Sequence, residues 1–599
     1  MSLLLRAKDN NSACHSCPEY QRAVSGLTVL FSAWFCIGLL CYLPDNGGSG
    51  LTLPFNIFCW LVMATATLWL VLTLPAGALR IQVYRHARWS GWTWLLPAGA
   101  LLWSAPLLWS PSAESRLESL PHVAALWGLL GFLWLLRRLP LRTLRLRHWL
   151  TVLWCAALLQ ALFGFLQVTM LAKLGGFTGN RPFGIFQQAN VQASFLATGL
   201  ACLLFCQLFI RSKSFLIRMV AGFATVFLPF VLMLLQSRAG GLGASCAALV
   251  LSVVYLKSAN TLRGLILPWL LIGAGIGLAI LLQHGKLEFL NTLGISTQNL
   301  MAMRDTSAST QDRWYILQNT WQMILQHPWM GSGYGSFEAA FAQQTLSSGG
   351  VYNSATLIHP HNELMYAWAE GGLVALSGML LMIAGIALSL WQKGGLRWGG
   401  IALLLPIALH MNLEFPLYQS VPHGMALVIV LSLVLAPYIP AGETLKKEQC
   451  NMGGLCICIR EEGLRAVAFV TGLIVLTFMA GALQTQQALV AVERQGMYPL
   501  VVDESGTVDK LWNPWSLPTR LDFDRHISLL MRYNLTRDAR LLTQFDGWAA
   551  EYLTRHNDPN MMASRLMIAR TLTPATWPAL CHHAHLQWPA DERFQCPQD

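Results

Sequence analysis

One stretch is the most informative part of the sequence: His359-Pro360-His361-Asn362-Glu363-Leu364-Met365-Tyr366-Ala367-Trp368-Ala369-Glu370-Gly371-Gly372. It lies where a long polar segment meets a long apolar one. Asn362 stands where a helix N-cap is expected. Glu363 and Glu370 are seven residues apart and therefore share one face of the helix that follows. Polar groups are costly at a membrane boundary, so this stretch is the first candidate for a functional site.

The composition predicts a membrane protein. Of 599 residues, 54% are hydrophobic and only 12% are charged, whereas about a quarter of the residues of a soluble protein are charged. Apolar runs of about 20 residues recur, which predicts transmembrane helices. The runs are long and do not alternate, which excludes a β-barrel. We attribute the net charge of +11 to loops at the membrane and not to nucleic-acid binding.

The distribution of Lys and Arg predicts the orientation. Loop 137–147 contains five Arg, whereas loop 44–54 contains no Lys or Arg. The alternation continues along the chain and places the N-terminus in the cytoplasm. An odd number of spans then places the C-terminal tail on the far side. The thirteen predicted spans are 23–43, 55–76, 91–110, 120–136, 148–170, 190–210, 215–236, 239–256, 264–283, 362–390, 398–414, 421–440 and 464–484.

Two segments are long enough to fold outside the membrane, and both fall on the far side. Apolar periodicity in the tail predicts a small helical domain. Cys581 and Cys596 in this tail can form a disulfide if it lies outside the cytoplasm. The predicted division is into N-terminal transmembrane helices (1–283), a large far-side loop (284–361), C-terminal transmembrane helices (362–484) and a helical domain (485–599).

Several far-side loops carry basic residues. Arg238 lies in a tight hairpin on the side that positive charge avoids, which favours an anion ligand over a snorkelling anchor. Arg313 lies in the large loop, where a surface charge and an anion ligand are equally good readings. Arg181, in a Gly-rich loop, is a weaker candidate. Gly331 to Gly335 is better read as a tight turn than as a phosphate loop, because it lacks a Walker lysine.

His361 has the clearest chemical rationale. It immediately precedes a predicted helix, whose N-terminus attracts an anion such as a diphosphate. The same field disfavours the imidazolium, so the ring can stay neutral and accept a proton. The alternative is a metal site formed by His359, His361 and Glu363, for which Pro360 makes the geometry unfavourable. Glu370 lies roughly 10 Å further along the helix and has no assigned role.

Five motifs occur in order along the chain. They are Gly-Asn-Arg-Pro-Phe-Gly with Gln-x-Asn (179–190), Ser-Arg-Ala-Gly (237–240), Arg-Trp followed by His-Pro-x-x-Gly-x-Gly (313–333), His-Asn-Glu (361–363) and Glu-Phe-Pro-Leu (414–417). Together they resemble the O-antigen ligase and polymerase superfamily, and within it the bacterial O-linked protein oligosaccharyltransferases of the PglL/PilO type. The resemblance covers the fifth to twelfth spans.

The resemblance implies an all-α, GT-C-like polytopic fold in the bacterial inner membrane, with the active site and tail in the periplasm. It implies transfer of an oligosaccharide from undecaprenyl diphosphate in the lipid bilayer to a Ser or Thr hydroxyl of pilin or another exported protein. It also implies in-line displacement at the anomeric carbon, without a metal or other cofactor.

By matching position, the resemblance assigns roles to individual residues. His361 would be the catalytic base, and Arg238 and Arg313 would bind the diphosphate. Gln187 makes the register of the first motif ambiguous, and Ala189 replaces a common Pro. The residues expected to bind substrate are Arg181, Gln188, Asn190, His359, Asn362, Glu414 and Tyr418.

Other functions remain open at this point. On the same scaffold, the chain could ligate O-antigen to lipid A core or polymerise polysaccharide repeats. The Gly-rich loop and the soluble tail favour protein glycosylation. A transporter of lipid-linked sugars would predict charged residues near the midplane and repeated halves, neither of which we find. A receptor or scaffold would leave the boundary His and Arg residues unexplained.

Overall fold

The structure is a computed structural model. It describes residues 18–75, 78–79, 81–82, 92–139, 141–171, 181–210, 212–258, 261–284, 306–348, 357–391, 396–435, 458–459 and 461–596. Residues 179–180 of the first motif and residues 285–305 and 349–356 of the large loop lie outside these ranges, so the predictions for them are not addressed.

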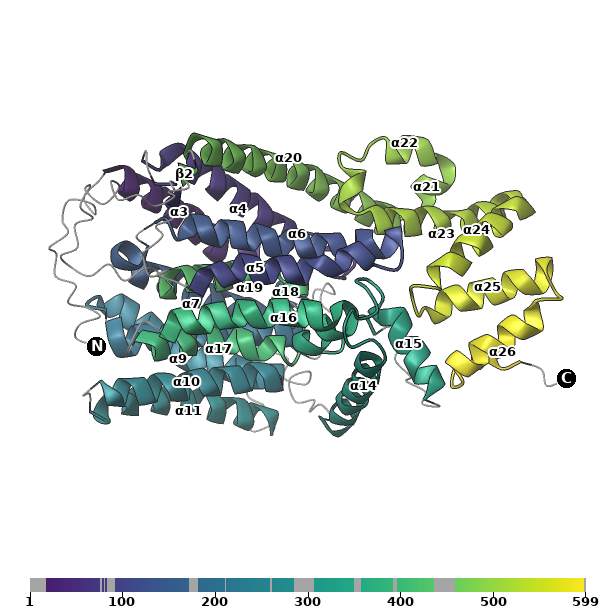
Figure 1. The fold of residues 1–599 in the computed structure, drawn as a ribbon. Coiled ribbons are helices and arrows are strands. Elements are labelled where there is room, and N and C mark those ends of the chain that lie inside the picture. Colours follow the sequence, from purple (N-terminus) through teal and green to yellow (C-terminus); the bar gives the residue numbers. More distant parts are fainter. Residues whose placement is uncertain are drawn as a thin grey trace.

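A bundle of apolar helices forms most of the molecule, and the C-terminal helices extend beyond one end of it (Figure 1). Helices suit a lipid bilayer because each helix pairs its own backbone N–H and C=O groups, which lipid cannot do. The bundle contains α3 (Pro18–Cys36), α4 (Pro54–Thr73), α5 (Leu95–Ser104), α6 (Ala113–Leu136), α7 (Leu141–Val168), α8 (Ala189–Phe205), α9 (Phe215–Leu235), α10 (Arg238–Lys257), α11 (Arg263–Gln283), α16 (Glu363–Trp391), α17 (Leu396–Met411), α19 (Val421–Val434) and α20 (Glu461–Arg494).

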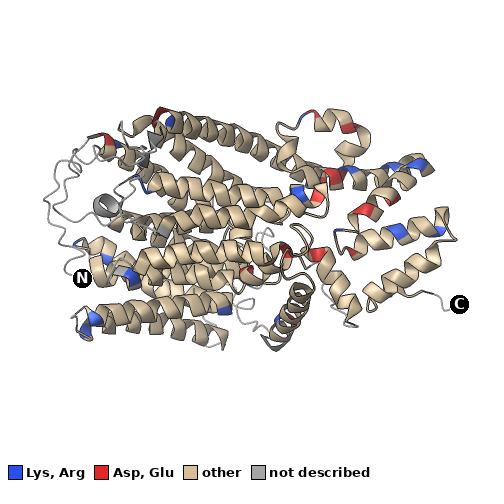
Figure 2. Cartoon of the chain, viewed as in Figure 1, with Lys and Arg blue, Asp and Glu red and all other residues tan. Residues whose placement is uncertain are grey.

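The predicted spans correspond to helices of two lengths. Ten described helices are long and apolar enough to cross a membrane, and three apolar helices are shorter: Leu95–Trp109, Arg397–Met411 and Val421–Val434. Each predicted span overlaps one of these helices. The chain is therefore a multi-pass membrane protein. Lys and Arg are sparse along the bundle helices and more frequent at their ends and in the tail (Figure 2).

Helix α8 lies at the centre of the bundle. All but one of its residues are buried, and it packs against α7, α9, α10 and α17. Around this centre, α5 pairs with α16 and α4 pairs with α20. Because α8 follows directly after Gln188, this packing fixes the end of the first motif against the middle of the protein.

Smaller elements join and cover the bundle. The large loop contains α14 (Thr306–Gln326) and α15 (Phe337–Ser347), and α18 (Pro416–Gln419) links α17 to α19. One antiparallel pair of two-residue strands, β1 (Ile81–Gln82) and β2 (Cys458–Ile459), is the exception to the predicted all-α fold within the described residues. The tail contains α21 (Tyr498–Val502), α22 (Glu504–Val508), α23 (Pro518–Thr536), α24 (Ala539–Tyr552), α25 (Pro559–Leu572) and α26 (Trp577–Gln587).

Helix α16 is broken at Gly372, where φ is 62° and ψ is −162°. This conformation is open essentially only to glycine. The loop after α14 fits into the break: Leu373 donates its backbone N–H to Pro328 (2.9 Å), and Gly333 donates to the carbonyl of Glu370 (2.8 Å). The Gly331–Gly335 turn is thus held against the broken helix.

The break also explains Glu370. Its Oε1 accepts hydrogen bonds from the backbone N–H groups of Ser336 (3.0 Å) and Phe337 (2.9 Å). Phe337 is the first residue of α15, so the carboxylate satisfies donors that a helix start leaves unpaired. A buried acid needs a hydrogen-bond partner, and for Glu370 that partner is the N-terminus of α15.

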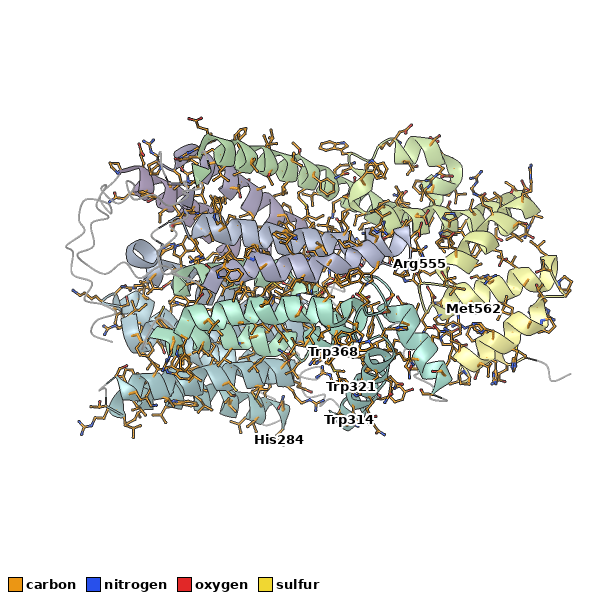
Figure 3. All side chains as sticks on the ribbon, viewed as in Figure 1. His284, Trp314, Trp321, Trp368, Arg555 and Met562 are labelled. Carbon is orange, nitrogen blue, oxygen red and sulfur yellow. A yellow bond between two sulfur atoms is a disulfide. The ribbon has the colours of Figure 1, made fainter. Side chains whose placement is uncertain are left out.

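A turn between α24 and α25 brings the tail back to the end of the bundle. His556 lies 3.0 Å from Glu338 of α15 and 3.3 Å from Glu118 of α6. Arg555 also pairs with Glu118, at 3.4 Å, and Figure 3 shows Arg555 where the tail faces the bundle. At the C-terminal end, a disulfide joins Cys581 to Cys596.

Candidate active site

Glu414 is the centre of the candidate site. It follows the end of α17, and only 2% of its side chain is exposed. One oxygen, Oε2, lies 2.7 Å from Nδ1 of His361. The other, Oε1, accepts a hydrogen bond from Asn190 at 3.0 Å and forms an ion pair with Arg313. Three predicted residues from distant parts of the chain therefore meet at the carboxylate of a fourth.

This contact determines the tautomer of His361. A carboxylate only accepts hydrogen bonds, so Nδ1 of His361 must be the donor. In the neutral ring, the lone pair is then on Nε2. Burial raises the pKa of Glu414, but the hydrogen bond from His361 and the charge of Arg313 outweigh burial, so the pKa lies below its usual value. The carboxylate stays ionised and holds the imidazole in one orientation.

The backbone around His361 is held in an unusual conformation. Its φ is 58°, in the left-handed region, and its backbone N–H donates to Nδ1 of His359 at 2.9 Å. Asn362 accepts a hydrogen bond from the backbone N–H of Met365 (3.0 Å) and so caps α16 as the sequence suggests. Its Nδ2 also donates to the carbonyl of Asn412 at 3.3 Å. Backbone strain of this kind is often found at functional sites.

The predicted arginines are connected through α14 and the hairpin between α9 and α10. Arg238 is the first residue of α10 and donates to Thr310 of α14 at 2.7 Å. Thr310 is three residues before Arg313, so the two share a face of α14. Arg181 donates to the carbonyl of Leu235 at 3.3 Å, at the end of α9. Arg238 and Arg313 are thus brought to the same part of α14, and Arg181 contacts the end of α9 three residues before Arg238.

Buried aromatic residues lie behind His361. The ring of His359 is 4.5 Å from that of Phe415 and 5.8 Å from that of Tyr418. The Tyr418 ring also packs on His122 of α6 at 4.4 Å. Burial lowers the pKa of His359, with further contributions from His361 and His122, and burial raises the pKa of Tyr418. Both side chains are therefore uncharged near neutral pH.

The first motif is divided between two roles. Gln187 has a left-handed φ of 57° and donates a hydrogen bond to Asp45. Gln188 is the N-cap residue of α8, and its buried Oε1 has no partner among the described residues. Asn190, two residues later, reaches Glu414. Gln187 therefore holds a loop in place, whereas Gln188 and Asn190 belong to the start of α8.

The alternative metal site is not assembled in this geometry. Within the described ranges, no group of three or more His, Cys, Asp or Glu side chains is placed to hold a metal ion. Nε2 of His359 is 3.7 Å from Glu363, and Nδ1 of His361 faces Glu414 instead.

Sequence reasoning missed two features of the site. It treated Glu414 as a substrate-binding residue, not as the partner of His361, because nothing in a separation of 53 positions indicates a contact. It also missed His122, which contacts Tyr418 from α6. A lone histidine in an apolar run gives no signal of this kind.

Two family comparisons match parts of the chain that carry some of these residues, and Glu414 and Tyr418 lie outside both matches. Residues 223–380 match the O-antigen ligase family. Residues 182–205 match a protein glycosylation ligase family. The first match contains Arg238, Arg313 and His361, and the second contains Gln188 and Asn190. No curated protein matches the chain significantly.

Proposed function

Since the chain belongs to the family of O-antigen ligases and PglL-type protein glycosylation ligases, we propose that it is an O-linked oligosaccharyltransferase. It moves an oligosaccharide en bloc from undecaprenyl diphosphate to Ser or Thr hydroxyls of exported proteins such as pilin. The hydroxyl oxygen forms a bond to the anomeric carbon, and the bond from that carbon to the diphosphate oxygen breaks. The diphosphate leaves with the electron pair, and His361 takes the hydroxyl proton.

The single observation that carries the proposal is the 2.7 Å contact between Nδ1 of His361 and Glu414. It leaves the Nε2 lone pair to accept a proton, and the carboxylate stabilises the imidazolium that forms. Such a pair is the recurring form of a histidine base oriented by an acid. General base catalysis of this kind contributes about 100-fold or more.

The arginines support binding of the leaving group. Arg238 contacts Thr310, one turn from Arg313 on α14, and a diphosphate is large enough to bind more than one guanidinium. Preorganised positive groups stabilise the charge that develops as the glycosidic bond breaks. Arg238 also starts α10, whose N-terminal N–H groups favour an anion.

The charge bias of the loops supports a periplasmic site. If the N-terminus is cytoplasmic, the end of the bundle with α14, α15 and the tail faces the periplasm. A donor carried by the bilayer would then reach His361 from the membrane, and a folded acceptor would approach from the side of the tail.

A second function on this scaffold has a specific observation in its favour. The longer match, residues 223–380, is to the O-antigen ligase family, whose description does not name a protein acceptor. The shorter match, residues 182–205, is to protein glycosylation ligases and favours a protein acceptor. The two functions differ in the acceptor and share the chemistry.

An acceptor comparison tests the proposal. Cells that contain a lipid-linked glycan would express the chain with a tagged pilin, and mass spectrometry would measure the glycan on the pilin and on lipid A core. We expect glycan on the pilin, and its loss in His361→Ala and Arg238→Ala. His284→Ala is the matched control, because His284 is an exposed histidine at the end of α11 (Figure 3). Modification of lipid A core alone would favour the ligase, and full transfer by folded His361→Ala would refute the base assignment.

A further inference from the structure

Helix α20 has an exposed apolar surface, which in a membrane span would face lipid. Exposed apolar side chains follow one another at intervals of three or four residues, which is one helical face. The opposite side of α20 packs on α4, where Gly472 lies against Leu68. The exposed surface includes Val467, Val470, Ile474 and Phe478 along one line, with Phe469 and Leu473 beside them.

Contacts with α4, which is itself a candidate span, indicate where each part of α20 lies along the thickness of the membrane. At one end, Arg465 donates to the carbonyls of Val71 (2.8 Å) and Leu74 (2.9 Å) at the end of α4. At the other end, Gln486 donates to the carbonyl of Thr52, just before α4 begins (3.0 Å). The interval from Arg465 to Gln486 is about 20 residues or roughly 30 Å, the thickness of the hydrocarbon core.

The loop 511–517 of the tail lies next to the end of the membrane-spanning part of α20. The backbone N–H of Trp512 donates to Gln484 at 2.8 Å, and Nδ2 of Asn513 donates to the carbonyl of Phe478 at 3.0 Å. A Cβ atom on Gly481 would lie 2.8 Å from Cβ of Asn513, so the close approach requires glycine there. The loop therefore lies alongside the last two turns of the span.

The loop points two tryptophans outward. Leu511 and Leu517 are buried against Leu489 of α20, whereas Trp512 is 74% exposed and Trp515 is 82% exposed. Large apolar side chains this open to water are unfavourable, and at this depth they continue the lipid-facing surface of α20. Tryptophan is also the residue type that concentrates where the bilayer meets water.

We propose that Trp512 and Trp515 form a membrane anchor, with their indole rings inserted at the boundary between headgroups and acyl chains. The partner is the phospholipid bilayer itself. The anchor fixes the base of the tail, because Pro518, the first residue of α23, follows directly. This inference concerns the membrane and not the reaction, so it stands or falls independently of the proposed transferase activity.

Site-specific photo-crosslinking tests the anchor. Trp512→p-benzoylphenylalanine and Trp515→p-benzoylphenylalanine would be prepared in the full chain, placed in phospholipid nanodiscs and irradiated. Leu535→p-benzoylphenylalanine is the matched control, because Leu535 is 71% exposed near the far end of α23. Mass spectrometry should find phospholipid adducts at both tryptophan positions, roughly tenfold above the control if the rings lie at the membrane boundary. Adducts at the control level, or adducts to protein instead of lipid, would overturn the proposal.

A second measurement uses the unaltered chain and does not depend on folding of a variant. Hydroxyl radicals formed in water would oxidise the protein in nanodiscs, with each rate divided by that of the same residue in the unfolded chain. We expect strong protection of Trp515, although its side chain is open in the structure, and little protection of Met567, which is 69% exposed on α25. Equal relative rates for Trp515 and Met567 would contradict insertion into lipid.

Discussion

Glu414 is the residue on which the candidate chemistry depends. Its two oxygens join a histidine to an arginine, and both contacts form in a buried environment where charges interact strongly. The carboxylate also offsets the Arg313 charge next to a ring that must become positive during proton transfer. In the proposed reaction, the same residue would therefore orient the base and limit repulsion between two cationic groups.

Replacing Glu414 should slow the reaction more than it weakens binding. In Glu414→Gln, the amide keeps the shape but loses the charge that fixes the tautomer and stabilises the imidazolium. We expect kcat for glycan transfer to fall by about 10⁴-fold, since loss of the acid in comparable histidine–acid pairs costs this order. Steady-state kinetics with purified donor and pilin would measure it.

The control for this variant is close by. Asn412→Ala removes a side chain whose Nδ2 bonds only one turn back, to the carbonyl of Ala408 at 3.0 Å, and should leave kcat unchanged. If Glu414→Gln turns over as fast as the unsubstituted chain, the carboxylate does not assist His361.

The sequence identified the members of the site better than their pairing. Arg238 stands out because Lys and Arg are uncommon in short loops on the far side of the membrane, and His361 stands out because it precedes a helix N-terminus. The chemistry of Arg313 alone left a surface charge and an anion ligand equally good. The partnership of His361 with Glu414 depends on how α16 and α17 lie together, which no local pattern encodes. Similarly, Asn362 was recognisable as a cap from its position, but its contact with Asn412 was not.

At the scale of elements, the break in α16 separates two environments. Residues 363–371 belong to a layer of loops around α14 and α15, and the longer part beyond Gly372 packs along α5. Hydropathy predicted the span 362–390 because the residues after Glu370 are predominantly apolar. It could not predict the break at Gly372, because two adjacent glycines in an apolar segment also occur in straight helices.

Gly372 should not tolerate a side chain. In Gly372→Ala, the backbone conformation alone costs about 1–3 kcal/mol, and the new Cβ would lie 2.2 Å from the carbonyl oxygen of Trp329. We expect a lower thermal unfolding midpoint and reduced transfer activity. Circular dichroism melts in detergent would measure the first.

Gly222→Ala is the matched control for this experiment. Gly222 lies within α9, and a Cβ there meets nothing within 4 Å, so alanine should leave the midpoint unchanged or raise it slightly. Equal midpoints for Gly372→Ala and the unsubstituted chain would show that the break is not required.

At the scale of the whole molecule, a few charged contacts tie the tail to the bundle. Apolar periodicity predicted a helical tail, and the cysteines suggested a disulfide that the structure contains. The docking of His556 on Glu118 and Glu338 was not predictable, because single ion pairs between residues more than 200 positions apart leave no trace in the sequence.

This docking should weaken in alkali. Burial lowers the pKa of His556, but the hydrogen bonds that its ring donates to Glu118 and Glu338, together with their charges, outweigh burial and raise the pKa to about 9. A raised pKa in the folded state stabilises the contact fully below about pH 6.5, the value of an unperturbed histidine. The contribution is lost as the pH rises through about 9. Hydrogen exchange of residues 553–560, corrected for intrinsic rates, should therefore increase across this range.

The variant His556→Gln separates deprotonation of His556 from any other increase in hydrogen exchange at high pH. The variant should exchange faster than the unsubstituted chain at pH 7 and should lose the dependence on pH. Identical pH profiles for the two proteins would exclude His556 as the titrating group.

The break at Gly372 also has a mechanical consequence. Leu373–Trp391 by itself is about 19 residues or roughly 28 Å long, enough to match the hydrocarbon thickness. When the bilayer thins or thickens with temperature or lipid composition, this rod can tilt to compensate. The short segment that follows His361 is held against the loop layer by Trp368, which donates to the carbonyl of Pro328 (3.0 Å), and by Glu370, which accepts from Ser336, so the tilt need not reach it. The geometry around His361 is thereby insulated from changes in the thickness of the membrane.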